Sequence, residues 1–319
     1  MESPAFIYLA PFQGITGRVF RSCFSKYFNG IDKIFTPYFA SINSNKKLSE
    51  KKAFELECTA ENSIPVIPQI LSKDPDEIIR FSKLIEEIGF SELNWNLGCP
   101  YPQVANKKRG SGMLPYPKMV DEILERVFDE INIKFSVKCR LGYSSADEID
   151  DLINVFNNYP LRELIVHPRI GKQLYSGETD LNKFGFIVNK TNKLTVYNGD
   201  IFSLEHFLLL KQKFPSNTHF MIGRGLLSNP FLAAEIKGLD LPEDKINHLL
   251  KFITELYLAY RKKTNNSLSV IGFMKEYWNY LAECFPNSKY VLRKIKKVRN
   301  FDEYENAVWQ IFESAKSEN

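Results

Sequence analysis

A regular alternation of strand-type and helix-type segments over residues 1–238 limits this chain to few architectures. Short apolar runs rich in β-branched and aromatic residues predict strands at residues 6–10, 34–38, 66–71, 92–96, 135–138, 163–167, 194–198 and 219–223. Apolar residues at helical spacing predict helices at 74–88, 117–131, 147–156, 204–214 and 229–236. Eight such units in ~235 residues match the usual length of a (β/α)8 TIM barrel, and a doubly wound sheet is the alternative.

Polar residues and glycines gather where the predicted strands end. A barrel builds its active site from the carboxyl ends of its strands, so a functional barrel should place polar residues at these points. The strand ends carry Pro11, Phe12, Gln13, Gln69, Asn96, Cys99, Lys138, Arg140, His167, Asn198, Gly199, Asp200, Gly223 and Arg224. This repetition at nearly every strand supports a barrel with one shared site.

The alternation stops after residue 238. Residues 239–319 contain three apolar stripes at helical spacing, beginning near Leu249, Met274 and Val291. The chain is therefore predicted to be an α/β protein with a TIM-barrel catalytic domain at 1–238 and an all-helical domain at 239–319.

The glycines after the last two predicted strands point to a phosphate site, which barrels commonly form there. Arg224 would neutralise the phosphate, and tight turns alone are the alternative. Lys138 ends an apolar strand, where a cation is costly unless it is paired or used. A flavin suits it, because a cation near N1 or O2 of the ring stabilises the reduced anion. An ion pair that holds the barrel together is the alternative for Lys138.

Two further side chains suit such a cofactor. Gln69 offers an amide to the pyrimidine edge of a flavin, with a satisfied buried amide as the alternative. His167 follows an apolar strand and precedes a glycine-containing loop, so we predict a contact with cofactor or substrate.

Cys99 lies between a glycine and a proline, which indicates an accessible and reactive cysteine. It supports two chemistries, a thiolate nucleophile with His167 as its base or a thiol that donates a proton. The motif and its neighbours favour the proton donor. Small apolar fillers are predicted at Cys23, Cys58, Cys139 and Cys284.

The cysteine count and the N-terminus bear on the setting. Five scattered cysteines argue against a disulfide framework, and no spacing suggests a metal site, so a reducing cytoplasm is expected. No signal peptide is recognised, and no apolar run approaches the ~18 residues that span a bilayer.

Basic residues form three clusters, although the net charge is only +4. One lies in the Cys99 loop, with Lys107 and Arg109, and another covers 261–263. The third lies between residues 286 and 300 and contains Lys289, Arg293, Lys294, Lys296, Lys297 and Arg299. A solvated helix face is the alternative, but the three clusters together fit a polyanion that reaches from the helical domain to the barrel mouth.

The residues that carry these features resemble the tRNA-dihydrouridine synthase family. The similar segments are LAPFQGIT (9–16), NLGCP (96–100), GSGML (110–114), VKCRLG (137–142), VHPR (166–169), QLYSG (173–177), NGD (198–200) and GRG (223–225). The resemblance implies a monomeric FMN enzyme that reduces the C5–C6 bond of a uridine in tRNA with NADPH, with no metal and no membrane contact.

The resemblance also implies roles for particular residues. FMN would be bound by Pro11, Phe12, Gln13, Gln69, Asn96, Lys138, His167, Asn198, Gly199, Asp200, Gly223 and Arg224. Cys99 would protonate C5 after hydride reaches C6. The tRNA would contact Asn96, Lys107, Arg109, Arg140, Arg169, Lys172, Arg293, Lys294, Lys296 and Lys297.

Two other functions stay open at the level of sequence. An FMN-dependent barrel oxidoreductase acting on a free pyrimidine or other small molecule would share the phosphate site and even the cysteine. The basic helical tail distinguishes the two, because a small substrate does not need it. An RNA-binding barrel without catalysis is the other, and the presence of Cys99, Lys138 and His167 together argues against it.

Overall fold

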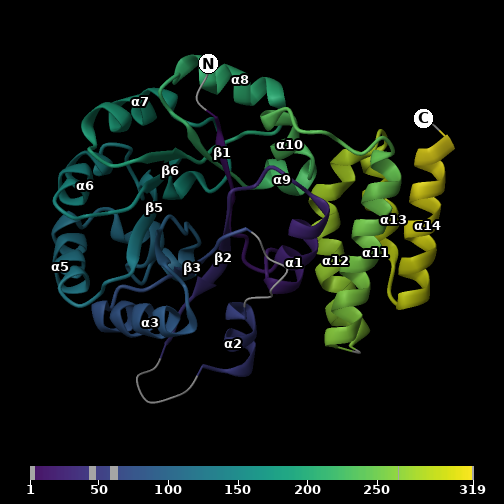
Figure 1. Ribbon diagram of the computed structural model, residues 1–319, viewed down its shortest axis with the longest axis horizontal. Helices are drawn as coiled ribbons and strands as arrows, with labels where there is room; N and C mark the ends of the chain where they lie inside the picture. Colours follow the sequence, from purple (N-terminus) through teal and green to yellow (C-terminus); the bar gives the residue numbers. More distant parts are fainter. Residues whose placement is uncertain (1–3, 43–47, 58–63, 265, 318–319) are drawn as a thin grey trace.

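The computed structural model describes residues 4–42, 48–57, 64–264 and 266–317, and its centre is a closed barrel of eight parallel strands (Figure 1). The strands are β1 (Phe6–Leu9), β2 (Lys33–Phe39), β3 (Val66–Ile70), β4 (Glu92–Leu97), β5 (Lys134–Gly142), β6 (Leu164–Ile170), β7 (Thr195–Tyr197) and β8 (His219–Ile222). Each strand pairs with the next in the chain, and β1 pairs with β8 in parallel. The predicted barrel is confirmed, because this last pairing closes the sheet.

Helices surround the barrel. They are α1 (Arg18–Tyr27), α2 (Glu50–Leu56), α3 (Pro75–Ile88), α4 (Pro102–Ala105), α5 (Pro117–Phe128), α6 (Glu148–Asn157), α7 (Leu181–Lys190), α8 (Leu204–Lys213), α9 (Arg224–Ser228) and α10 (Leu232–Lys237). The helix predicted at 229–236 is wrong at its start, since α9 ends before Asn229 and α10 begins only at Leu232. The prediction also missed α1, α2 and α7, and α7 carries Gly185 in its interior, which lowers its helix propensity.

The strands divide their side chains between two layers, because successive residues of a strand point to opposite faces. On β5, Phe135, Val137 and Cys139 belong to the apolar core between the barrel and its helices. The alternate residues Ser136 and Lys138 face the barrel interior. There a separate apolar cluster fills the barrel, made of Tyr8, Ala10, Phe35, Ile67, Ile165, Val196 and Met221.

The rest of the described chain is helical, as predicted. The helices α11 (Lys245–Lys263), α12 (Ser267–Leu281), α13 (Ser288–Lys297) and α14 (Phe301–Ser317) stand together at one side of the barrel (Figure 1). Helix α11 packs on α1 through Phe252, whose ring meets those of Phe20, Phe24 and Phe28 at 4.9–6.3 Å between centroids. Within the described ranges, no helix is both long and apolar enough to cross a membrane.

Candidate active site

Two adjoining pockets lie at the carboxyl ends of the strands and share Pro11, Phe12, Lys138, His167 and Tyr175 in their walls. One extends over the ends of β7 and β8, and the other extends toward β2 and β4. The structure brings every residue predicted to bind the cofactor into this cleft, together with Cys99. These residues are Pro11, Phe12, Gln13, Gln69, Asn96, Cys99, Lys138, His167, Asn198, Gly199, Asp200, Gly223 and Arg224.

The pocket over β7 and β8 contains Arg224, which donates a hydrogen bond to Asp200 Oδ1 at 2.6 Å. The guanidinium also lies over the rings of Tyr175 and Phe202, at 5.0 and 5.3 Å. The strand-end glycines are needed by the fold itself. A Cβ at Gly199 would overlap the Tyr197 hydroxyl. A Cβ at Gly225 would overlap the backbone carbonyl oxygen of Ile201.

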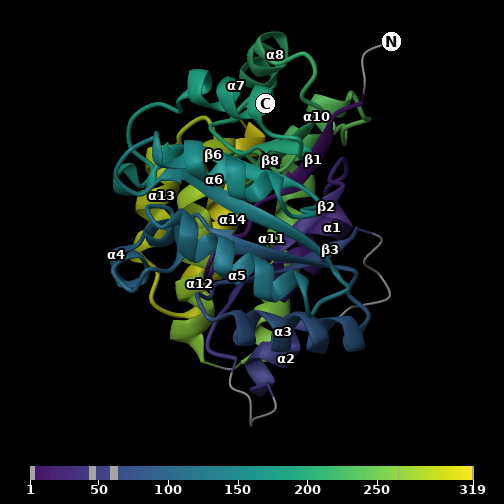
Figure 2. The same cartoon turned by 90° about the vertical axis from the view of Figure 1, so that its left-hand side faces the viewer.

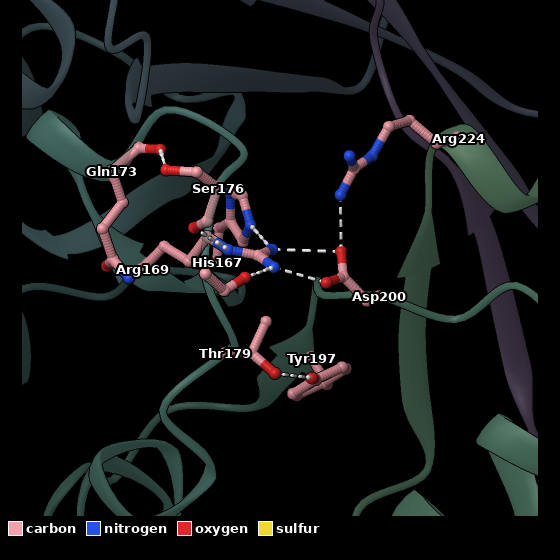
Figure 3. Close-up of polar contacts among 9 residues, drawn as sticks. His167, Arg169, Gln173, Ser176, Thr179, Tyr197, Asp200 and Arg224 are labelled. Atoms are coloured by element: carbon pink, nitrogen blue, oxygen red, sulfur yellow. Dashed lines mark hydrogen bonds and ion pairs between the residues drawn. The ribbon is translucent and has the colours of Figure 1, made fainter.

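Arg169 holds the wall of this pocket together (Figure 3). Its guanidinium donates to both carboxylate oxygens of Asp200, to His167 Nε2 at 3.1 Å, and to the carbonyls of Ser176 and Gly177 at 3.3 and 2.6 Å. The side chain is 1% exposed. Sequence reasoning expected Arg169 to contact the substrate, but the structure turns its donors inward, so it positions the loop after β6 and Asp200.

His167 is held as a neutral imidazole. Burial, followed by the charges of Arg140, Lys138, Arg169 and Arg224, lowers the pKa of His167 well below its usual range. A guanidinium can only donate hydrogen bonds, so Nε2 must accept from Arg169 and the ring proton lies on Nδ1. His167 therefore presents an N–H donor to its remaining neighbours.

Lys138 faces both pockets. Among the residues that the structure describes, none forms a hydrogen bond or an ion pair with its ammonium group. Burial, with the charge of Arg140 as the second cause, lowers the pKa of Lys138 to about 8. A cation without a partner is costly even where it is only partly buried, so the cleft is suited to an acceptor or an anion at this point.

A chain of buried amides leads from the barrel interior to Cys99. Gln69 donates to Asn94 Oδ1 at 2.7 Å and accepts from Asn96 Nδ2 at 2.7 Å. Asn96 Oδ1 in turn accepts from the backbone N–H groups of Gly98 and Cys99, at 3.0 and 2.9 Å. Asn96 thereby fixes the turn that carries the cysteine.

Cys99 is 7% exposed, so the accessible cysteine expected from the sequence is wrong in that respect. Its carbonyl accepts from Ser111 N and Ser111 Oγ, both at 3.0 Å. Gly110 lies against it with φ of 55°, and a Cβ there would come within 2.6 Å of the Cys99 carbonyl oxygen. Only glycine adopts this backbone without strain while allowing the contact.

The Cys99 sulfur is a thiol rather than a thiolate. Burial raises the pKa of Cys99 and outweighs the Tyr101 backbone, the charges of Arg140 and Lys138, and a hydrogen bond from Tyr38. Tyr38 packs beside Cys99 and lines the same pocket. Among the hydrogen bonds of the described residues, none joins Cys99 to His167, the base that a thiolate nucleophile would need. This environment favours a proton donor.

The remaining predicted contacts lie at different depths. Arg140 reaches the cleft but is 1% exposed, and it donates to the carbonyls of Gly98 and Ile170 at 3.1 and 2.9 Å. Lys107 and Lys172 are exposed on the loops after β4 and β6, and Arg109 is half-buried. Helix α13 lies outside the cleft, with Arg293, Lys296 and Lys297 exposed and Lys294 donating to the Tyr290 hydroxyl at 2.6 Å.

The loop after β4 is folded onto the barrel. It contains α4 and the 3-10 helix η1 (Gly110–Met113), and all four residues of η1 are buried.

The fillers predicted at Cys23 and Cys139 are buried and Cys284 is partly buried, while Cys58 lies outside the described residues. No group of three or more His, Cys, Asp or Glu within the described ranges is placed to hold a metal ion.

Sequence reasoning assigned no role to Tyr38, Tyr101 or Tyr175, which all line the pocket around Cys99. Tyr38 lay hidden in an apolar run. The available signal was Pro37, because proline inside a strand indicates an edge or a bulge, and bulges commonly redirect a side chain beside an active site.

Comparisons with known proteins point to one family over most of the chain. A family model described as dihydrouridine synthase matches residues 8–316. The tRNA-dihydrouridine synthase B of Pasteurella multocida is 27% identical over 266 residues, which cover 80% of this chain and 78% of the relative. The probable tRNA-dihydrouridine synthase 2 of Bacillus subtilis is 28% identical over 265 residues, with 81% and 80% covered.

Two solved structures have a similar fold at low sequence identity. A morphinone reductase variant in complex with tetrahydroNAD has a TM-score of 0.53 at 7% identity, with 76% of this chain and 89% of that chain covered. A variant of NCR from Zymomonas mobilis has a TM-score of 0.50 at 12% identity, with the same shares covered. At such identities the similarity concerns the barrel fold alone.

Proposed function

This chain belongs to the dihydrouridine synthase family, and from that membership we propose that it reduces the C5–C6 double bond of a uridine in tRNA, with FMN as cofactor and NADPH as reductant. The observation that carries the chemistry is the protonated, buried thiol of Cys99 beside a cationic cleft. A thiol so placed can act as an acid toward a base held in the cleft.

The cleft suits FMN in charge and in donor chemistry. Cationic side chains at Lys138, Arg140 and Arg224 face a single carboxylate, Asp200, which two arginines already neutralise. An anionic phosphate would lie near Arg224 and the β7 and β8 loops, and Lys138 would meet the polar edge of the ring. When bound, FMN supplies the hydride that uridine C6 receives.

The proton comes from the protein in this proposal. Cys99 donates it to C5, on the side of the base away from the hydride source. Asn96 and Ser111 hold the backbone of Cys99 from both sides, through the hydrogen bonds to its N–H and its carbonyl, so the sulfur is fixed before the base arrives. Such pre-positioning lowers the entropic part of the barrier.

We further propose that residues 1–238 bind FMN and that residues 239–319 bind tRNA. A uridine inside a folded tRNA must be swung out to reach the cleft, which costs a few kcal/mol. Cations on α13 and on the loop around α4 would supply this energy through phosphate contacts. Both segments lie toward the same side of the molecule (Figure 2), and Tyr280 of α12 touches Phe12 at the cleft, at 5.8 Å between centroids.

The substitution Cys99→Ala tests the reaction. We expect flavin content and NADPH oxidation to persist while dihydrouridine formation in tRNA falls at least about 100-fold, because the acid is lost. Mass spectrometry of tRNA nucleosides measures the product.

The matched control is Cys284→Ala, which removes a partly buried thiol far from Cys99 in the chain and should leave product formation unchanged. Undiminished dihydrouridine formation by the Cys99→Ala protein would rule out the proton-donor role. Free uridine reduced as fast as tRNA would instead favour the small-molecule oxidoreductase.

A further inference from the structure

Tyr38 lies beside the thiol that the proposed function uses. It lines the pocket around Cys99 and packs against the small cluster formed by Leu71, Cys99 and Val104. The side chain is half-buried and borders the pocket. The chemistry described so far gives this hydroxyl no task.

The local fold of β2 directs Tyr38 into the cleft. Phe35 points into the barrel and Phe39 belongs to the outer core. Residues four apart share one face of a regular strand, so these opposite orientations require a break in the alternation. The register between β2 and β3 shifts between Phe35 and Tyr38, so a bulge reverses the alternation there. Pro37 cannot donate to the sheet, and the Thr36 hydroxyl accepts from Gln69 N at 3.1 Å in place of a strand carbonyl.

This bulge turns Tyr38 inward at the level of Cys99. Without the bulge, Tyr38 would share the outward face of β2 with Ile34. The bulge distorts β2 at the point where Tyr38 enters the cleft. Bulges are common beside active sites, where they redirect a side chain.

The electrostatics of the pair agree with the geometry. Burial raises the pKa of Cys99, whereas the Tyr101 backbone, the charges of Arg140 and Lys138 and the neighbouring Tyr38 hydroxyl all act to lower it. Burial, followed by the interaction with Cys99, raises the pKa of Tyr38. Tyr38 therefore keeps its proton and acts as a donor toward sulfur.

We propose that Tyr38 is a further residue of the proton-donating step, and that its hydroxyl stabilises the Cys99 thiolate as it forms. This inference rests on the proposed function. The Cys99 S–H bond breaks, its proton forms the new C–H bond at C5, and the electron pair stays on sulfur. The Tyr38 O–H bond remains intact and donates to that sulfur. A proton from water then restores the thiol.

The role can be measured on the thiol itself, without tRNA. Alkylation of Cys99 by iodoacetamide, followed over pH by peptide mass spectrometry, reports the midpoint at which the thiolate appears. In Tyr38→Phe this midpoint should rise by about 1 pH unit, because a hydrogen bond to a charged group is lost. Cys99→Ala identifies the peptide that carries the signal.

Matched variants separate this role from packing. Tyr159→Phe removes a hydroxyl bonded to Asp121 Oδ1 at 2.6 Å on the outside of the barrel, and it should leave the midpoint unchanged. 4-Aminophenylalanine at position 38 has nearly the same shape and keeps a weaker N–H donor that does not ionise in this range. The midpoint should therefore lie between those of the wild type and Tyr38→Phe, and this variant serves also where Tyr38→Phe does not fold. The same midpoint in all of these proteins would overturn the proposal.

Activity gives the second measurement. With tRNA, Tyr38→Phe should lose about 10-fold in kcat for dihydrouridine formation with little change in KM or in flavin content. If the wild type forms no dihydrouridine but the midpoint still rises in Tyr38→Phe, the proposed function is refuted and the Tyr38–Cys99 coupling stands. Loss of flavin together with an unshifted midpoint would show that Tyr38 only packs the cleft.

Discussion

At the scale of the residue, the cleft is a site where stability is given up for binding. Lys138 is partly buried in the wall of the cleft, and its positively charged form is disfavoured in the folded protein. The charge of Arg140 disfavours the protonated form of Lys138 further. A side chain that destabilises the folded state is understandable where an acceptor or an anion is to be bound, and this is the position that we assign to the polar edge of FMN.

Replacing Lys138 with methionine should therefore stabilise the protein without cofactor. The pKa of Lys138 is about 8 when folded, against about 10.4 in an unfolded chain. At pH 7 the charged form costs up to about 3 kcal/mol of folding free energy. Urea unfolding of the apoprotein should show this gain, and FMN titration should show weaker binding.

The pH dependence has a definite sign. Between pH 8 and 10 the unfolded chain keeps the proton on Lys138 and the folded protein releases it, so the wild type gains stability as pH rises. The difference between Lys138→Met and wild type should therefore shrink over this range. Lys134→Met, an exposed position on the same strand, is the control and should change stability by less than about 0.5 kcal/mol. A less stable Lys138→Met apoprotein would contradict the argument.

At the scale of the element, α13 is the segment best suited to a polyanion. The helix buries Val291 and Ile295 against its neighbours and leaves cations on its other faces. A shallow surface hollow next to it is lined by Lys275, Lys296, Lys297, Val298, Arg299 and Glu303. A charged face of this kind binds phosphates without reading sequence.

Neutralising α13 should weaken tRNA binding and leave the cleft unchanged. In a protein with Arg293, Lys294, Lys296 and Lys297 replaced by glutamine, tRNA affinity should fall. Its dependence on salt should flatten by up to about 0.9 in log–log slope for each lost phosphate contact. Filter binding over a range of salt concentrations measures both, and flavin absorbance should stay the same.

The control neutralises Lys134 and Arg162, which are exposed at the opposite, amino-terminal ends of β5 and β6. These changes should have little effect on tRNA affinity. A loss of binding free energy in the control about half that of the α13 protein, in proportion to two rather than four charges, would mean that only overall charge matters. An unchanged affinity in the α13 protein would place the docking surface elsewhere.

At the scale of the whole molecule, the barrel and the C-terminal helices share one packed interface. Phe252 of α11 is fully buried among the phenylalanines of α1. A second contact joins α12 to the cleft, where Tyr280 meets Phe12. Because the first contact is apolar and fully buried and the second joins two half-buried rings, we expect the two parts to unfold together.

Phe252→Ala tests this coupling. Removing the ring should lower the free energy of unfolding by about 3–5 kcal/mol, because it leaves a cavity between α1 and α11. Far-ultraviolet circular dichroism and tryptophan fluorescence should give coincident transitions in the wild type. Leu258→Ala, at a side chain 53% exposed on the same helix, should change stability by less than about 0.5 kcal/mol. Two separate wild-type transitions would show that the parts are independent.

The architecture could be predicted from sequence because it depends on local periodicity. Strand-type runs with polar ends repeat at regular intervals, and the same pattern that predicts a barrel also places Lys138, His167 and Asn198 at one mouth. Helix α7 escaped prediction because Gly185 in its interior weakens the helical signal. The start of α10 was predicted three residues early because the break near Asn229 depends on the hydrogen bond that Asn229 Oδ1 accepts from the Phe231 backbone N–H.

The sequence by itself determined the barrel, the helical tail and which residues meet at the strand ends, since these depend on spacing along the chain. Tertiary structure alone decided what each side chain does there. It buried Cys99 and packed Tyr38 of β2 beside it, and it turned Arg169 away from solvent toward Asp200. Such pairings depend on register, bulges and burial between segments far apart in sequence, and no local pattern encodes them.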